Sequence, residues 1–201
     1  MTEQELELMV EQLSEDKFKN PTTTSNKFKI DLGKWLLGLP NSKKLKIVEL
    51  GTHKGQTTHI LSGIAYNGHV YTINLPNHFA EAQQINRLRT NISYVGLDLY
   101  PKNTINPIIT TDSVDVFFID AGHYFSQVES DFEYVMRFAR SEPSYIVFDD
   151  YGLIHDVRSF VDAMIWLNRI EVVQYIGMPE GTDFGGNRLL KHYEGIICKI
   201  I

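Results

Sequence analysis

Three carboxylates and an imidazole follow two apolar runs in the second half of the chain. One run ends in Asp120 and His123, and the other ends in Asp149 and Asp150. Clustered carboxylates repel one another, and a bound cation or a raised pKa is the usual resolution. Oxygen ligands of this kind suit Mg²⁺, Mn²⁺ or Ca²⁺ better than zinc, and an imidazole beside them could take a proton from a hydroxyl. The alternatives are helix-capping aspartates and a histidine in a surface loop.

A glycine-containing turn earlier in the chain could bind a ligand through its backbone. The segment from Glu49 to Gly55 reads E-x-G-x-x-x-G, with Gly51 and Thr52 between the ends. Glycines allow a ligand to approach the main chain, and the start of a helix presents free N–H groups. The Glu49 carboxylate could accept hydrogen bonds from hydroxyls or an ammonium group. The pattern differs from G-x-G-x-x-G, which argues against a dinucleotide. A tight turn with a purely structural role is the alternative.

Two further polar residues follow strand-like runs. Asn74, with Leu75 beside it, stands where nucleoside-binding domains usually place an acid for the ribose hydroxyls. Its amide can accept such a bond without the charge, or it can form a turn before Pro76. Asp98 could accept a hydrogen bond from an adenine amino group, or it could cap a helix or lie in solvent.

The elements that position these residues alternate along the chain. Strand-like runs at 46–50, 69–74, 92–96, 114–119 and 144–148 alternate with helical patterns at 56–64, 79–89, 125–140 and 153–168. This rhythm predicts an α/β fold with a doubly wound parallel sheet, right-handed crossovers and helices on both faces. Strand-like runs at 172–176 and 195–200 predict an antiparallel edge. The loop between them contains Arg188, which could bind an anion or pair with a surface acid.

Composition limits the classes of protein to consider. The 201 residues, 43% of them hydrophobic, suit one core, and a net charge of -6 argues against a nucleic-acid partner. Cys198 is the only cysteine, which excludes an intrachain disulfide and a cysteine zinc cluster. We see no signal peptide and no apolar run long enough for a bilayer, so we expect a cytoplasmic protein. Amphipathic patterns over 3–14 and 28–37 predict an N-terminal helical cap, residues 1–43, before a main domain, residues 44–201.

With these residues placed, the chain resembles the class I S-adenosylmethionine-dependent methyltransferases over residues 44–201. The segment from Glu49 to Gly55 is similar to the family's first motif. The segments F-I-D-A-G-H-Y at 118–124 and I-V-F-D-D-Y-G at 146–152 resemble motifs of small-molecule O-methyltransferases of the macrocin and catechol type. The resemblance implies a Rossmann-like seven-stranded sheet in the order 3-2-1-4-5-7-6, with strand 7 antiparallel.

The resemblance also implies a reaction and a set of roles. S-adenosylmethionine would donate a methyl group to a small-molecule or sugar hydroxyl, with Mg²⁺, or Mn²⁺ or Ca²⁺, orienting that hydroxyl. His123 and Asp120 are the predicted catalytic residues. The predicted metal ligands are Asp120, Asp149 and Asp150. The predicted cofactor contacts are Glu49, Gly51, Thr52, Gly55, Asn74, Leu75, Asp98 and Asp120.

Two departures from the family pattern are Asn74, in place of an acid, and Ala121, in place of a common glycine. The rival function is a methyltransferase-like binding or accessory module without turnover, and Asn74 is its best support. The expected partners are the small acceptor and no nucleic acid or membrane. A homo-oligomer is an open alternative.

Overall fold

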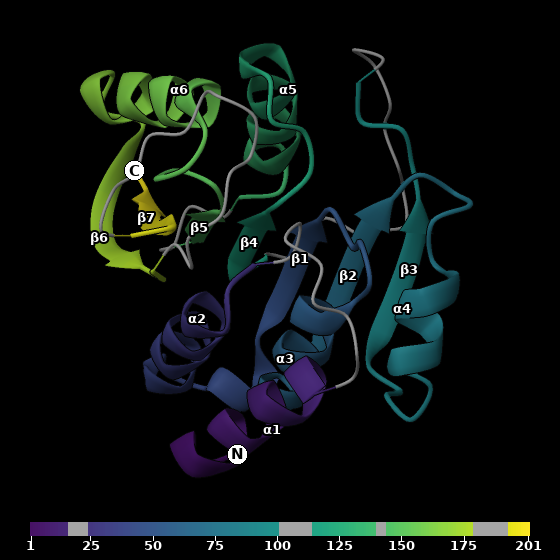
Figure 1. Ribbon diagram of the computed structural model, residues 1–201. Helices are drawn as coiled ribbons and strands as arrows, with labels where there is room; N and C mark the ends of the chain where they lie inside the picture. Colours follow the sequence, from purple (N-terminus) through teal and green to yellow (C-terminus); the bar gives the residue numbers. More distant parts are fainter. Residues whose placement is uncertain (16–23, 101–113, 140–143, 179–192) are drawn as a thin grey trace.

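A seven-stranded sheet lies at the centre of the computed structural model, which describes residues 1–15, 24–100, 114–139, 144–178 and 193–201 (Figure 1). The strand order is β3-β2-β1-β4-β5-β7-β6, which confirms the predicted fold class. The strands are β1 Lys46–Leu50, β2 His69–Asn74, β3 Ile92–Gly96, β4 Val116–Ile119, β5 Tyr145–Phe148, β6 Ile170–Ile176 and β7 Gly195–Ile200.

The strand directions bring the carboxyl ends of β1 to β5 to one edge of the sheet. Strands β1 to β5 pair in parallel, and β7 runs antiparallel to both β5 and β6. Glu49 lies opposite Thr72 on one side and Phe118 on the other. Strands β1, β4 and β5 are buried almost throughout, as expected when helices cover both faces. Residues that follow these strands are therefore neighbours in space.

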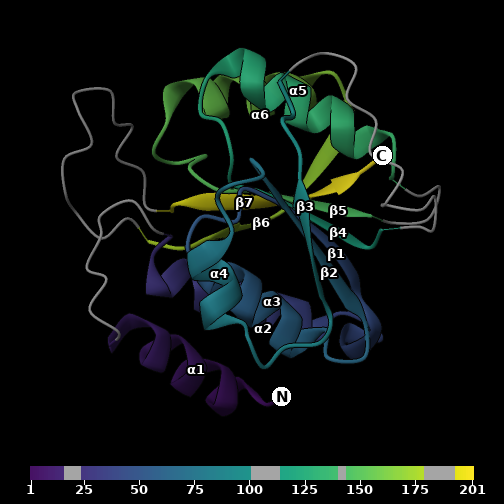
Figure 2. The same cartoon turned by 90° about the vertical axis from the view of Figure 1, so that its right-hand side faces the viewer.

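Helices cover the two faces unequally (Figure 2). Helices α5 and α6 lie on one face, and α1 to α4 lie on the other. The helices are α1 Glu3–Glu15, α2 Asn26–Gly38, α3 Gln56–Ile64, α4 Ala80–Ile85, α5 Phe125–Met136 and α6 His155–Trp166, with a short 3-10 helix η1 at Ser42–Lys44. None of the helices within the described ranges is long and apolar enough to cross a membrane.

The N-terminal helices pack on the sheet through an apolar core. Leu6 of α1 and Phe28 and Leu32 of α2 are buried in the same cluster as Ile60 and Leu61 of α3. Helix α2 begins after Ser25, whose hydroxyl accepts a hydrogen bond from the Phe28 N–H at 3.0 Å. The proposed boundary between a cap at 1–43 and a main domain at 44–201 stays a prediction.

Several predicted elements are longer than the observed ones. Helix α4 was expected over 79–89 but ends at Ile85, because the Asn86 side chain donates back to the carbonyls of Ala82 and Gly55. Strand β4 begins at Val116 rather than 114, and α5 ends at Met136 rather than 140. The predicted ligand role of Arg188 lies outside the described residues.

Candidate active site

A cavity of about 1200 Å³ opens at the carboxyl ends of the parallel strands. Its walls come from the segments that follow β1, β2, β3 and β4, and from the start of α6. Open α/β sheets bind ligands at this edge. The predicted site residues that line the cavity are Gly51, Thr52, Gly55, Asn74, Leu75, Asp98, Asp120 and His123. Glu49, Asp149 and Asp150 are not among its lining residues.

The turn after β1 requires glycine at two positions. Gly51 has φ +95°, and a Cβ there would lie 1.7 Å from the carbonyl oxygen of Asp120. Gly55 has φ +77°, and a Cβ there would lie 2.6 Å from the Cβ of Ala82. Both φ values fall where L side chains are strained. The turn therefore packs its backbone directly against the neighbouring segments while it lines the cavity.

Glu49 lies behind this turn rather than in the cavity. Its side chain is fully buried, and its Oε2 accepts hydrogen bonds from the hydroxyls of Thr58 and Thr72, each at 2.5 Å. Because Thr72 donates to Glu49, the Thr52 hydroxyl must donate to Thr72 across 2.6 Å. Burial raises the pKa of Glu49 to about 7, and the two threonine bonds oppose that shift. Glu49 is therefore linked to the cavity wall by hydrogen bonds through Thr72 and Thr52. Its predicted contact with the cofactor stays a prediction.

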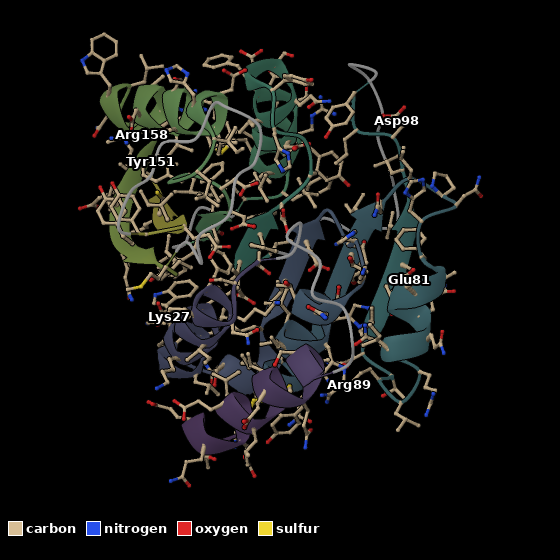
Figure 3. All side chains as sticks on the ribbon, viewed as in Figure 1. Lys27, Glu81, Arg89, Asp98, Tyr151 and Arg158 are labelled. Atoms are coloured by element: carbon tan, nitrogen blue, oxygen red, sulfur yellow. The ribbon has the colours of Figure 1, made fainter. Side chains whose placement is uncertain are left out.

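The far side of the cavity carries the residues predicted for a nucleoside. The Asn74 Oδ1 accepts a hydrogen bond from the Leu75 N–H at 2.8 Å, which leaves its second lone pair and the amide nitrogen for a ligand. The Asp98 Oδ1 accepts from the Tyr100 N–H at 3.1 Å. Figure 3 shows Asp98 beyond the end of β3 and Glu81 on α4, both on cavity-lining segments. Asn74 thus forms the local turn and also faces the cavity.

An acid–histidine cluster lies where β4 and β5 end. Asp120, His123 and Asp150 each offer a ligand atom, and these atoms all lie within 4.8 Å of one another. His123 Nε2 is 2.9 Å from Asp150 Oδ2. Asp150 adopts the left-handed conformation, with φ +58°. Such strain in a non-glycine residue is frequent at functional sites.

Asp149 is the buried neighbour of this cluster. Its side chain is 6% exposed, and its Oδ1 has no hydrogen-bond partner. Burial and the nearby Asp120 and Asp150 carboxylates raise the pKa of Asp149 well above its usual range. Burial and Asp150 likewise raise the pKa of Asp120, and the hydrogen bond to Asp150 raises that of His123. A cation or protons must balance these charges, so the residues fit a divalent ion.

Sequence reasoning missed part of the cavity wall. Thr24 lines it and lies 3.4 Å from Thr57, oxygen to oxygen. The next residue, Ser25, donates from its N–H to Glu194 at 2.9 Å and from its hydroxyl to the same carboxylate. No local motif signals these contacts, because their partners are 33 and 169 residues away. Other lining residues that the sequence did not single out include Gln56, Tyr100, Gln127, Ile154, His155 and Asp156.

The strand order, the glycine turn and the strand-end acids define the class I S-adenosylmethionine-dependent methyltransferase fold. A family model described as a methyltransferase domain matches residues 48–151, more than half of the chain. The chain belongs to this methyltransferase domain family.

Solved structures share the fold at low sequence identity. A putative caffeoyl-CoA O-methyltransferase from Staphylococcus aureus has a TM-score of 0.69 and 17% identity, covering 95% of this chain and 91% of that one. An O-methyltransferase from Bacillus cereus in complex with SAH (S-adenosylhomocysteine) has a TM-score of 0.65 and 19% identity, and the match covers 98% of this chain and 90% of that one. Fibrillarin from Aeropyrum pernix, with natively bound S-adenosyl-L-methionine, has a TM-score of 0.57 and 16% identity, and the match covers 84% of this chain and 73% of that one. The comparison with curated proteins returned no match.

Proposed function

We propose that the protein transfers a methyl group from S-adenosylmethionine to a hydroxyl of a small molecule or sugar, assisted by a divalent cation. The observation that carries this proposal is that the glycine turn lines the same cavity as Asp120 and His123, two members of the acid–histidine cluster. The methyl–sulfur bond of the sulfonium would break as a carbon–oxygen bond forms, leaving S-adenosylhomocysteine. The O-methyltransferase neighbours, one with bound SAH, support this reading.

The cofactor would extend along the cavity wall. Gly51, Thr52 and Gly55 would lie against its methionine end and sugar, and the start of α3 supplies N–H donors. Asn74 and Leu75 would contact the ribose side. Asp98 would accept a hydrogen bond from the adenine amino group.

The acceptor hydroxyl would meet the strand-end cluster. Asp120, Asp149 and Asp150 would hold the cation, which lowers the pKa of a bound hydroxyl and orients it. His123 Nε2 donates to Asp150 across 2.9 Å, which leaves Nδ1 to receive the hydroxyl proton. Neutral His123 is the form that can act as base, and Asp150 fixes the orientation of its ring. Tyr124, 71% exposed beside His123, offers an aromatic surface at the cavity wall.

The rival proposal is a binding or accessory module that keeps the fold without turnover. Asn74 is the observation that favours it, because an amide lacks the charge of the usual ribose-binding acid. The retained cluster of Asp120, Asp149 and Asp150 favours the enzyme, since buried acids without a cation are costly. The net charge of -6 argues against an RNA acceptor.

Transfer of a labelled methyl group tests the proposal. The protein would be incubated with methyl-labelled S-adenosylmethionine, Mg²⁺ and a panel of catechols and sugars, and compared with samples containing a chelator. We expect transfer to at least one acceptor, abolition by the chelator and a rate at least 100-fold lower in Asp120→Asn. The matched control is Asp115→Asn, at the other end of β4. Cofactor binding without transfer to any acceptor would favour the accessory module.

A further inference from the structure

A buried side-chain network outside the cavity holds the turn that lines it. Asn86 is 3% exposed, and its Nδ2 donates to the carbonyl oxygen of Gly55 at 3.0 Å and to that of Ala82 at 2.9 Å. The Gly55 oxygen also accepts the first helical hydrogen bond of α3, from the His59 N–H at 3.0 Å. Asn86 therefore joins the start of α3 to the end of α4 at the glycine that the cavity exposes.

His59 and Arg89 extend this network away from the cavity. The Asn86 Oδ1 lies 2.9 Å from His59 Nδ1, and His59 Nε2 lies 3.1 Å from Arg89 Nη2. An amide oxygen only accepts and a guanidinium only donates. The imidazole must therefore be neutral, with its proton on Nδ1 and an acceptor at Nε2. We call Asn86, His59 and Arg89 the turn relay.

The surroundings keep Arg89 in place. Its Nη2 lies 4.0 Å from the Met9 sulfur of α1, and Figure 3 shows Arg89 beside that helix. The absence of a side chain at Gly63 of α3 makes space for the Arg89 guanidinium, since a Cβ there would lie 3.0 Å from Arg89 Nη2. Arg89 is the charged group that the described residues bring within hydrogen-bond distance of the imidazole, because Asn86, the other side chain bonded to the ring, is neutral. Burial and Arg89 both lower the pKa of His59.

We propose that the turn relay is a set of positioning residues that holds Gly55 in its cofactor-binding conformation and works only while His59 is neutral. Protonation would place a second cation 3.1 Å from Arg89 and remove the acceptor at Nε2. The Nδ1–H would still donate to Asn86, but repulsion from Arg89 would displace the ring and strain that bond, and the turn would loosen. By linkage, a ligand that binds the ordered turn must make His59 harder to protonate. This inference rests on the proposed cofactor site.

Two asparagines allow a matched test. Asn86→Ala removes the bonds to the start of α3, whereas Asn91→Ala removes equivalent bonds from Asn91 Nδ2 to the carbonyls of Ser62 and Ala65 near its other end, at 3.0 and 2.9 Å. Calorimetry with S-adenosylhomocysteine at pH 7.5 should show a dissociation constant roughly tenfold higher in Asn86→Ala. Asn91→Ala should stay within roughly twofold of the wild type, at a similar loss of thermal stability.

The wild-type protein supplies a second readout that needs no variant. In ¹⁵N-histidine NMR spectra we expect neutral His59 to carry its proton on Nδ1. We also expect S-adenosylhomocysteine to lower the titration midpoint of His59 by about one pH unit, which corresponds to a roughly tenfold difference in ligand affinity between the two protonation states. A proton on Nε2, or a midpoint that the ligand leaves unchanged, would overturn the turn relay alone. Equal affinities in the two alanine variants would do the same. Failure of the wild type to bind the ligand would overturn the proposed function and the relay together.

Discussion

Replacing Glu49 with glutamine tests how the buried carboxyl behind the cavity is charged. Glu49 is fully buried, and its pKa rises from 4.5 to about 7 on folding. The folded state then binds the proton more tightly than the unfolded state. Its contribution to stability is present below pH 4.5 and is lost as the pH rises through 7. At 1.36 kcal/mol per pH unit, the loss over this interval is about 3 kcal/mol.

Glutamine does not titrate, but its oxygen can still accept from Thr58 and Thr72. The unfolding free energy of Glu49→Gln, taken relative to the wild type, should therefore rise by about 3 kcal/mol between pH 4 and pH 8. Urea unfolding of the variant and the wild type at intervals of half a pH unit measures how the difference in their unfolding free energies changes with pH. Glu171→Gln, at an exposed position on β6, is the control and should stay within about 0.5 kcal/mol of the wild type. A flat difference for Glu49→Gln would mean that folding leaves the pKa of the carboxyl near 4.5, and the burial argument would fail.

Three further substitutions test the turn, the nucleoside side and the N-terminal contact. Gly51→Ala should destabilise the folded protein by about 3 kcal/mol or more in thermal unfolding, since the new Cβ would lie 1.7 Å from a backbone oxygen. The control Gly38→Ala, whose Cβ would have nothing within 4 Å, should change stability by less than about 1 kcal/mol. Asn74→Asp should lower the dissociation constant of S-adenosylhomocysteine roughly fivefold in calorimetry, because a charged acceptor strengthens bonds from hydroxyls; unchanged binding would remove Asn74 from the site. Ser25→Ala should cost about 1 to 2 kcal/mol in urea unfolding through loss of the helix cap and a bond to Glu194, and a cost below about 0.3 kcal/mol would contradict that contact.

The sequence predicted the sheet because its strands are continuous apolar runs between helical patterns. All seven predicted strands match the observed ones within two residues, and the antiparallel edge follows from a tail without a helical crossover. Strand-end acids could be placed at one edge by the same logic. Helix ends were harder to predict, as α4 shows, because its end depends on Asn86 reaching a carbonyl 31 residues away.

The missed parts of the site depend on contacts that no local pattern encodes. Glu49 follows the strand pattern, but the alternation of faces sends its side chain behind the turn to Thr58 and Thr72. His123 pairs with Asp150, which has a left-handed backbone, and the residue types reveal neither feature. The contact of Thr24 with Thr57 depends on how the N-terminal helices pack.

The roles proposed for the cavity all depend on binding of S-adenosylmethionine at the glycine turn. A structure of the wild-type protein soaked with S-adenosylhomocysteine and Mg²⁺ tests it most directly. We predict the methionine end of the ligand against Gly51 and Gly55, its ribose beside Asn74, and the ion between Asp120 and Asp150. A ligand bound elsewhere, or an empty cavity at saturating ligand, would contradict the account.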